Sequence, residues 1–404
     1  MSRTDDLISD VAPAGVPFRQ VGEIAEIASA RIDASTLDCT TYVGVDNLLQ
    51  NFRGRSDSGY SGSSGGAIRF EPGDILIGNI RPYLKKVWLA DRVGGASPDV
   101  VTVTRRPPWR ERVIPRFMFY VLASDGFINY MMKHAKGGKM PRGDKSALLR
   151  YRIPVPPLEV QREVVRILDT FSELEAELEA ELEARRVQYA YYRDSLMDYG
   201  TLGDVRRLPL GEIGTLVRGN GLPKSDFTES GVGAIHYGQI YTYYGTWTTE
   251  TISYVAPETA VRLAKVDPGD VIITNTSENL DDVGKAVAWL GDRQIVTGGH
   301  ATILKHHENP KFIAYWLQTP QFYSQKKRLA TGTKVIDVSA SQLAQVVIPL
   351  PSRVEQDRVV RILDDFDELL SDLSVGLPAE LRARRQQYEH YRDRLLTFKE
   401  LPGE

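Results

Sequence analysis

The feature that most constrains the fold of this 404-residue chain is an internal repeat. The segment PVPPLEVQREVVRILD at 154–169 aligns with PLPSRVEQDRVVRILD at 349–364, with nine of 16 positions identical. Further on, ARRVQYAYYRDSL at 184–196 aligns with ARRQQYEHYRDRL at 383–395, with nine of 13 identical. The offset grows from 195 to 199, so the second copy has four extra residues between the blocks. Two such blocks in the same order indicate a tandem duplication.

Weaker repeats occupy the segments before these blocks. EPGDILIGN at 71–79 parallels DPGDVIITN at 267–275, and each reads as a Pro-Gly turn that leads into an apolar strand. AKGGK at 135–139 parallels ATGTK at 330–334. Each half is therefore predicted to be a variable α+β domain of about 150 residues followed by a long helix. The expected boundaries are 1–153 and 201–348 for the domains, and 154–200 and 349–404 for the helical segments.

The helical segments have the pattern of a coiled coil. Residues 158–198 contain neither glycine nor proline, and their apolar residues recur in steps of four and three. Seven acidic side chains between Asp169 and Glu183 would meet arginines at 382, 384 and 385 if the two helices paired antiparallel, although a glutamate run is also typical of a solvated helix face. A break is expected near Gly376–Pro378. The predicted seam consists of Val164, Ile167, Phe171, Leu174, Leu178, Val359, Ile362, Phe366 and Leu369.

This layout resembles the specificity subunit of type I restriction–modification enzymes. The resemblance is carried by Ile153-Pro154-Val155-Pro156-Pro157 with Gln161, by Ile348-Pro349-Leu350-Pro351 with Gln356, and by the two ARRxQYxxYRDxL blocks. The PGD elements at 72–74 and 268–270 are also similar to that family. The second turn departs from the pattern at Ser352. The resemblance covers essentially the whole chain.

The resemblance implies two target-recognition domains, each of which reads one half of a bipartite double-stranded DNA target. It implies two long antiparallel helices that separate the domains with pseudo-twofold symmetry, set the gap between the half-sites and dock two methyltransferase subunits. S-adenosylmethionine is then expected on the partner methyltransferase, with no cofactor on this chain. Restriction and translocase subunits are further partners in that family. The triple ELEA repeat at 173–184 has the form of the family's spacing element.

Motifs for catalysis are missing from the sequence. It has no (N/D)PP(Y/F) loop of an adenine methyltransferase, no Walker A loop and no histidine–carboxylate set for a metal. The single cysteine, Cys39, excludes an internal disulfide and a cysteine zinc cluster. We therefore expect a non-catalytic protein without a metal, located in the cytoplasm because no signal peptide or transmembrane stretch is apparent.

Contacts to DNA are expected from basic or polar side chains next to predicted strand ends and glycines. For each lysine or arginine the alternative is an ordinary solvated position, and for the tyrosines it is packing. The expected DNA-contacting residues are Arg53, Arg55, Arg81, Tyr83, Lys85, Lys86, Lys136, Lys139, Arg142 and Lys145 in the first domain, and Lys224, Tyr243, Asn275, Ser277, Lys326, Lys327, Thr331, Thr333 and Lys334 in the second.

Two other functions fit parts of the pattern. A coiled-coil adaptor that binds proteins without reading DNA would explain the helices alone and predicts salt-insensitive partner binding. A single-chain restriction or methylation enzyme would need the missing catalytic loops. The duplicated arrangement of domain and helix favours a DNA-recognition subunit over both.

The distribution of charge predicts weak DNA binding by the chain alone. Residues 1–150 carry a net charge of +5 and residues 201–345 a net charge of 0, whereas the helical segments 151–200 and 346–404 carry −5 and −3. Partner subunits should therefore supply much of the salt-dependent phosphate contact. Titration of labelled duplex with the isolated chain at physiological salt tests this, and tight binding would contradict it.

Overall fold

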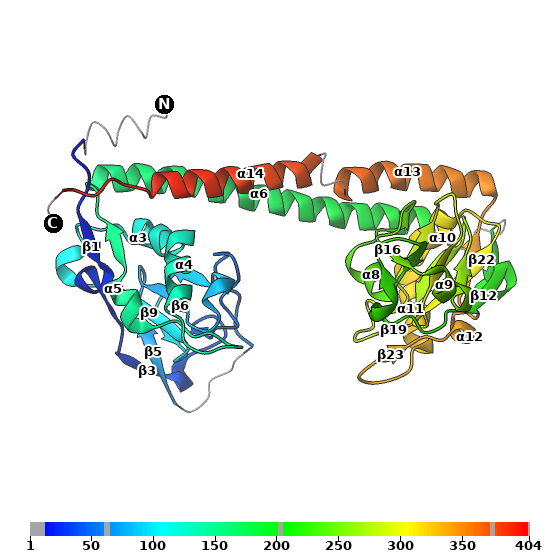
Figure 1. The fold of residues 1–404 in the computed structure, drawn as a ribbon, viewed down its shortest axis with the longest axis horizontal. Helices are drawn as coiled ribbons and strands as arrows, with labels where there is room; N and C mark the ends of the chain where they lie inside the picture. Colours follow the sequence, from blue (N-terminus) through cyan, green and yellow to red (C-terminus); the bar gives the residue numbers. More distant parts are fainter. Residues whose placement is uncertain (1–12, 60–64, 201–204, 372–375, 403–404) are drawn as a thin grey trace. The chain divides into compact units, whose positions relative to one another are not determined.

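The computed structural model describes residues 13–59, 65–200, 205–371 and 376–402 (Figure 1). The chain divides into two compact units, Met1–Glu179 with Glu380–Glu404, and Ala180–Ala379. Each unit contains one α+β domain and parts of two long helices. Among the described residues, no helix is both long and apolar enough to cross a membrane.

The first domain contains two four-stranded sheets, with strand orders β2-β9-β6-β7 and β3-β5-β8-β4, and a two-stranded sheet of β1 and β10. Helices α3 and α4 contribute Phe117 and Phe127 to its core. The elements are β1 (Phe18–Gln20), α2 (Val21–Ile24), β2 (Ala25–Ile27), β3 (Arg31–Asp33), β4 (Tyr42–Val43), β5 (Gly66–Phe70), β6 (Ile75–Gly78), β7 (Val87–Leu89), β8 (Gly94–Ala96), β9 (Val100–Arg105), α3 (Pro115–Leu122), α4 (Asp125–Lys133), α5 (Lys145–Arg150) and β10 (Arg152–Pro154).

The second domain repeats this plan with two five-stranded sheets, of orders β12-β22-β18-β20-β15 and β13-β16-β14-β21-β17. Strands β11 and β24 form the counterpart of the β1–β10 pair, and β19 pairs with β23. The elements are β11 (Arg206–Pro209), α7 (Leu210–Ile213), β12 (Gly214–Arg218), β13 (Phe227–Thr228), β14 (Val232–Ile235), α8 (Tyr237–Thr242), β15 (Trp247–Thr248), β16 (Ser253–Val255), α9 (Pro257–Arg262), β17 (Ala264–Val266), β18 (Val271–Thr274), β19 (Thr276–Ser277), β20 (Ala286–Trp289), β21 (Ile295–Thr297), β22 (Ala301–His306), α10 (Pro310–Trp316), α11 (Pro320–Leu329), β23 (Ile336–Asp337), α12 (Ala340–Leu343) and β24 (Val347–Leu350).

The repeated PGD motif forms the predicted turn and strand in both domains. Gly73 and Gly269 have φ of +89° and +95°, a region that L side chains rarely adopt. The Asp74 carboxylate accepts a hydrogen bond from the backbone N–H of Glu71, and that of Asp270 accepts one from Asp267. Every residue of the following strands, β6 and β18, is buried. The motif therefore places a central strand in each core.

The first repeated helical segment forms one helix, α6 (Leu158–Met197), and the second contains two, α13 (Arg353–Ser371) and α14 (Gly376–Leu395). The predicted break falls where α13 ends and α14 begins, and residues 372–375 between them lie outside the described ranges. Pro378 is in the first turn of α14, where a proline leaves no backbone hydrogen bond unmade.

Helix pairing within each unit is antiparallel. In the first unit, Phe171 of α6 stacks on Tyr391 of α14 with ring centroids 5.3 Å apart, and Glu175 accepts a hydrogen bond from Arg385. In the second unit, Tyr192 of α6 stacks on Phe366 of α13 at 5.7 Å. Both stacks use equivalent residues of the repeat, so the two pairs share one packing geometry.

The predicted seam is correct in part. Val164 and Val359 are fully buried, and Ile167, Phe171, Leu178, Ile362 and Phe366 are half-buried. Leu174, however, is 38% exposed, whereas Leu178 is half-buried and Leu182 is 8% exposed. Leucines four residues apart advance 400° per step, so they drift by about 40° per step, and Leu174 lies at the edge of the apolar stripe that Leu182 enters. The side chain of Leu369 lies outside the described residues.

A buried glutamine fastens each domain to its long helix. The Gln161 carboxamide accepts from the Ile114 N–H and donates to the Arg112 and Pro156 carbonyls, each at 2.8 Å. Gln356 in the repeat accepts from the Asn309 N–H and donates to the Pro351 carbonyl, both at 3.0 Å. Both glutamines are fully buried. We refer to Gln161 and Gln356 as the fastening glutamines.

Replacement of a fastening glutamine should destabilise its own unit. Gln161→Leu leaves one buried N–H and two carbonyls without partners, which costs about 3 kcal/mol and lowers Tm by about 6–12 °C. Gln356→Leu should act similarly on the second unit. The matched control, Gln386→Leu, changes an exposed side chain of α14 and should shift stability by less than about 0.5 kcal/mol. Calorimetry distinguishes these variants, and equal Tm values for Gln161→Leu and the control would refute the role.

Candidate nucleic-acid interface

In the first domain, the loop after β6 (residues 79–86) pairs with a hairpin formed by residues 136–142. Ile80 bridges Arg142, and the Arg81 N–H donates to the Pro141 carbonyl at 3.1 Å. Just after the hairpin, the Gly143 N–H donates to the Asn79 carbonyl at 3.0 Å. Because β6 is buried in the core, these bonds hold the hairpin in a defined place on the domain.

The second domain has the same arrangement. The loop after β18 (residues 275–285) contains β19, which pairs with β23 in the hairpin of residues 331–337. The Val338 N–H donates to the Asn275 carbonyl at 2.8 Å, the counterpart of the Gly143–Asn79 bond. We call each loop with its hairpin a platform: residues 79–86 with 136–142, and residues 275–285 with 331–337.

Six of the residues predicted to contact DNA are exposed on or beside the first platform. Arg81, Lys139 and Arg142 are exposed, Tyr83 is 46% exposed, and Lys145 is the exposed first residue of α5. Lys136 is also exposed but pairs with Asp144 at 2.8 Å, and Arg142 pairs with Asp99 at 3.7 Å. The platform thus brings together basic residues from the two sequence clusters at 81–86 and 133–145, of which Arg81 and Lys139 have no described ion pair.

Other predicted residues of the first domain have partners within the protein. Lys85 forms an ion pair with Asp125, and the Lys86 ammonium donates to the Val45 carbonyl at 2.7 Å. Arg53 forms an ion pair with Glu179 of α6. The side chain of Arg55 is only 7% exposed and lies over the Trp88 ring, 5.4 Å from its centroid. The expectation for Arg55 is therefore corrected, because packing against Trp88 removes its guanidinium from the surface.

In the second platform, Thr331, Thr333 and Lys334 are exposed, and Ser277 is half-buried in β19. Lys327 is exposed in the last turn of α11. Lys224 and Tyr243 are exposed before β13 and after α8, and no described contact joins them to the platform.

Two predicted residues of the second domain are buried, and their assignment is corrected. The Asn275 side chain donates to the Val338 carbonyl at 2.6 Å and accepts from Thr302 at 2.9 Å. The Lys326 ammonium donates to the carbonyls of Asp281 and Val283, and burial lowers the pKa of Lys326 to about 8. Both side chains are buried and form hydrogen bonds to backbone carbonyls in or next to the platform, so they are not available to a groove of DNA.

The sequence reasoning missed Met140 and Val335, which are exposed apolar residues at the tips of the two hairpins. A signal was present, because they lie 195 residues apart and follow lysines at equivalent positions of the repeat. It was overlooked because only polar and basic side chains were considered as contacts to DNA.

Comparisons with known proteins agree with this duplicated plan. Residues 68–184 and 204–383 match the family model of the type I restriction modification DNA specificity domain. The EcoR124I/EcoR124II specificity subunit of Escherichia coli is 34% identical over 264 residues, 61% of this chain and 63% of that protein. The chain therefore aligns with less than two thirds of that relative.

A second relative and a solved structure extend the comparison. A putative type I restriction enzyme specificity subunit of Haemophilus influenzae is 28% identical over 302 residues, 72% of this chain and 74% of that protein. A chain from a structure of a type I R-M system aligns with a TM-score of 0.62 at 19% identity, over 95% of this chain and 97% of that one. At that identity the structural match bears on the fold alone.

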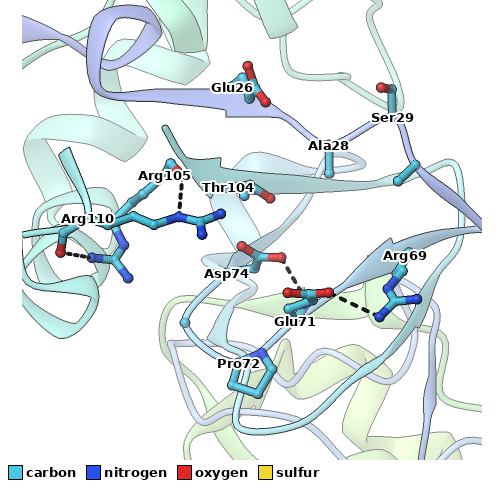
Figure 2. A pocket seen from close by; sticks show the side chains of 12 residues that line it. Glu26, Ala28, Ser29, Arg69, Glu71, Pro72, Asp74, Thr104, Arg105 and Arg110 are labelled. Carbon is cyan, nitrogen blue, oxygen red and sulfur yellow. Dashed lines mark hydrogen bonds and ion pairs between the residues drawn. The ribbon is translucent and has the colours of Figure 1, made fainter. Parts of the chain in front are cut away.

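At its PGD turn the first domain has a cavity of about 430 Å³ (Figure 2). Glu71 and Asp74 line it, together with Arg69, Thr104 and Arg105. Arg69 pairs with Glu71 at 3.1 Å, whereas no described ion pair reaches Asp74. Burial raises the pKa of Asp74, because the charged carboxylate loses solvent there.

In the second domain a lysine occupies the equivalent place. Strand register aligns Thr104 of β9 with Lys305 of β22, since Ile75 pairs with Val103 and Val271 pairs with Leu304. The Lys305 ammonium lies 2.7 Å from both the Asp267 and the Asp270 carboxylates. It lowers the pKa of Asp267. The first domain therefore keeps the two carboxylates but has Thr104 where the second domain has Lys305, and Arg105 is the basic residue that interacts with Asp74 there.

Thr104→Lys should supply this cation and stabilise the first domain. The gain should be about 1 kcal/mol at neutral pH, or about 2–4 °C in Tm, because the new ammonium offsets the buried charge of Asp74. Since the ion pair needs ionised Asp74, the gain over the wild type should be present above the raised pKa that Asp74 has in the wild type and should be lost as the pH falls through it. Thermal melts of the variant and the wild type at several pH values measure this. A gain that persisted in Thr104→Lys combined with Asp74→Asn would contradict the explanation.

Proposed function

The chain belongs to the family of type I restriction–modification DNA specificity domains, of which it carries two, and we propose that each domain reads one half of a bipartite DNA target. In this proposal the chain is the DNA-recognition subunit of a type I restriction–modification complex. The observation that carries the proposal is the platform, which occurs once in each domain and combines exposed polar and basic side chains with a rigid base. Such side chains both neutralise phosphates and read base edges.

The two platforms have different side chains, which supports an asymmetric target. The first presents Arg81, Lys139 and Arg142, whereas the second presents Ser277, Thr333 and Lys334. Arginine and lysine prefer the acceptor atoms of guanine in the major groove. The hydroxyl groups of serine and threonine can donate to or accept from the edges of different bases. Two domains with the same fold but different exposed side chains are therefore suited to two different half-sites.

The long helices would set the gap between the half-sites and dock two methyltransferase subunits. Each domain is fastened to its helix by buried hydrogen bonds, and in this proposal the gap would depend on helix length, which grows by 1.5 Å per residue. On α6, Val187 and Tyr191 are 63% and 69% exposed. Exposed apolar side chains within a repeated helical block support a surface for a protein partner.

Chemistry would come from the partners in this proposal. The chain itself would contribute no catalytic residue, metal or cofactor, and S-adenosylmethionine would be bound by the methyltransferase subunits. Restriction and translocase subunits would join the same complex. The cytoplasm is the proposed location, because the DNA target lies there.

Adenine methylation in the host tests the proposed function. Deletion of the gene should abolish methylation at one bipartite motif, and complementation should restore it, as read by methylome sequencing. Complementation with Arg81→Gln should lower methylation at that motif about tenfold, because a contact from this platform to a base or phosphate is worth about 1–3 kcal/mol. The control Arg92→Gln alters an exposed arginine paired with Asp91 and should behave as wild type. If every methylated motif survives the deletion, the proposal is wrong.

A further inference from the structure

The hairpins of the two platforms have the same backbone geometry despite different sequences. In the first, Lys136 and Arg142 exchange two backbone hydrogen bonds of 2.9 and 2.8 Å. In the second, Thr331 and Asp337 do the same with bonds of 2.9 and 2.8 Å. The residue after each of these first partners is a glycine, Gly137 or Gly332, with φ of +95°. A Cβ on Gly332 would lie 2.0 Å from the Val335 carbonyl oxygen, so this tight turn requires glycine at that position.

The base of each hairpin is fixed, whereas its tip is solvated. Residues 137–140 and 332–335 are all exposed. Below the tip, the Asp144 carboxylate caps α5 and pairs with Lys136. In the second domain, the Gln342 side chain ties α12 to the Leu329 carbonyl at 2.6 Å. An exposed tip on a fixed base can enter a groove of DNA without the loss of conformational entropy that ordering a flexible loop would require.

Each tip carries a lysine followed by an apolar residue. These pairs are Lys139-Met140 and Lys334-Val335, and no ion pair is described for either lysine. Met140 is 55% exposed and Val335 is 57% exposed. Isolated apolar residues are common on protein surfaces and by themselves need no explanation. Here the same combination recurs at the same place of two diverged hairpins, which sets these residues apart from incidental exposure.

We propose that the hairpin tips enter the DNA, with Met140 and Val335 in apolar contact with base edges and Lys139 and Lys334 on the adjacent phosphates. Apolar side chains read the thymine methyl group in the major groove, and a neighbouring ammonium contributes affinity without sequence information. Each tip then helps to specify one half-site. This inference rests on the proposed function and adds the residues that determine specificity.

The charges around the two tips favour DNA over a protein as the occupant. Exposed Lys139 precedes Met140 in the sequence, and the backbone N–H of exposed Arg81 donates to the carbonyl of Pro141, the residue after Met140. Arg142 is also exposed and pairs with Asp99 at 3.7 Å. Beside Val335, the second platform has Lys334 and the hydroxyl groups of Thr331 and Thr333. Phosphates require cations and hydroxyl donors at such positions. The first tip should accordingly make more of the salt-dependent contacts than the second.

The test uses the full chain assembled with its methyltransferase subunits and a library of randomised DNA targets. Met140→Ser and Val335→Ser are compared with the controls Val93→Ser and Val261→Ser, which change exposed valines of the first and second domains outside the platforms. Met140→Ser should lower methylation of the best target about tenfold and relax base preference only in the half-site read by the first domain. Val335→Ser should do the same only in the other half-site. Both controls should match the wild type.

The lysines provide a second, independent readout. Lys139→Gln and Lys334→Gln should weaken binding uniformly across sequences and reduce the slope of log affinity against log salt by about 0.9 each. Unchanged base preference in both serine variants would overturn the inference while the wild-type complex still read its bipartite target. Failure of the wild-type complex to select any sequence would instead refute the proposed function. A serine variant that lost its methyltransferase subunits but kept its base preference would place the tip at a protein interface and also overturn the inference.

Discussion

The orientation of each domain is determined by the contacts that fix it to its helix. At the start of the helix, the fastening glutamines Gln161 and Gln356 join the helix to domain backbone. Two turns further along, Asp169 of α6 accepts hydrogen bonds from Arg116 and Tyr120 of α3. Asp364 of α13 accepts the equivalent bonds from Lys311 and Tyr315 of α10. The two amides are fully buried and the two carboxylates are half-buried. Such polar groups are costly when their partners are missing, so these contacts favour one orientation of each domain on its helix.

A reader of bipartite DNA needs this kind of constraint. Selection of two half-sites at a fixed separation requires that the readers cannot tilt independently of the spacer. Within each unit, the fastening glutamine fixes the domain, the PGD turn fixes a buried strand, and the loop after that strand fixes the hairpin. A chain of hydrogen bonds therefore connects each hairpin to the helix of its own unit.

Much of this organisation was predictable because it leaves periodic traces in the sequence. The duplication, the PGD strands and the long helices follow from residues 71–79, 154–169 and 184–196 and their repeats. The contacts of individual side chains were not predictable. Lys326 resembles any surface lysine of an amphipathic helix until two backbone carbonyls are found around its ammonium. Arg55 likewise is removed from the surface by Trp88, which is 33 residues away in the sequence. Such contacts depend on tertiary structure and leave no local pattern.

The positions that differ between the domains show where the framework tolerates change. Buried Met131 of α4 corresponds to Lys326 of α11, and the lysine is accepted because carbonyls of the adjacent loop satisfy it. Thr104 corresponds to Lys305, whose ammonium is satisfied by two carboxylates that both domains retain. In both cases the exchange is compensated within one loop and does not reach the fastening glutamines. Because the fixed contacts and the variable contacts use separate residues, the side chains of the platforms can diverge while the attachment of each domain to its helix is unchanged.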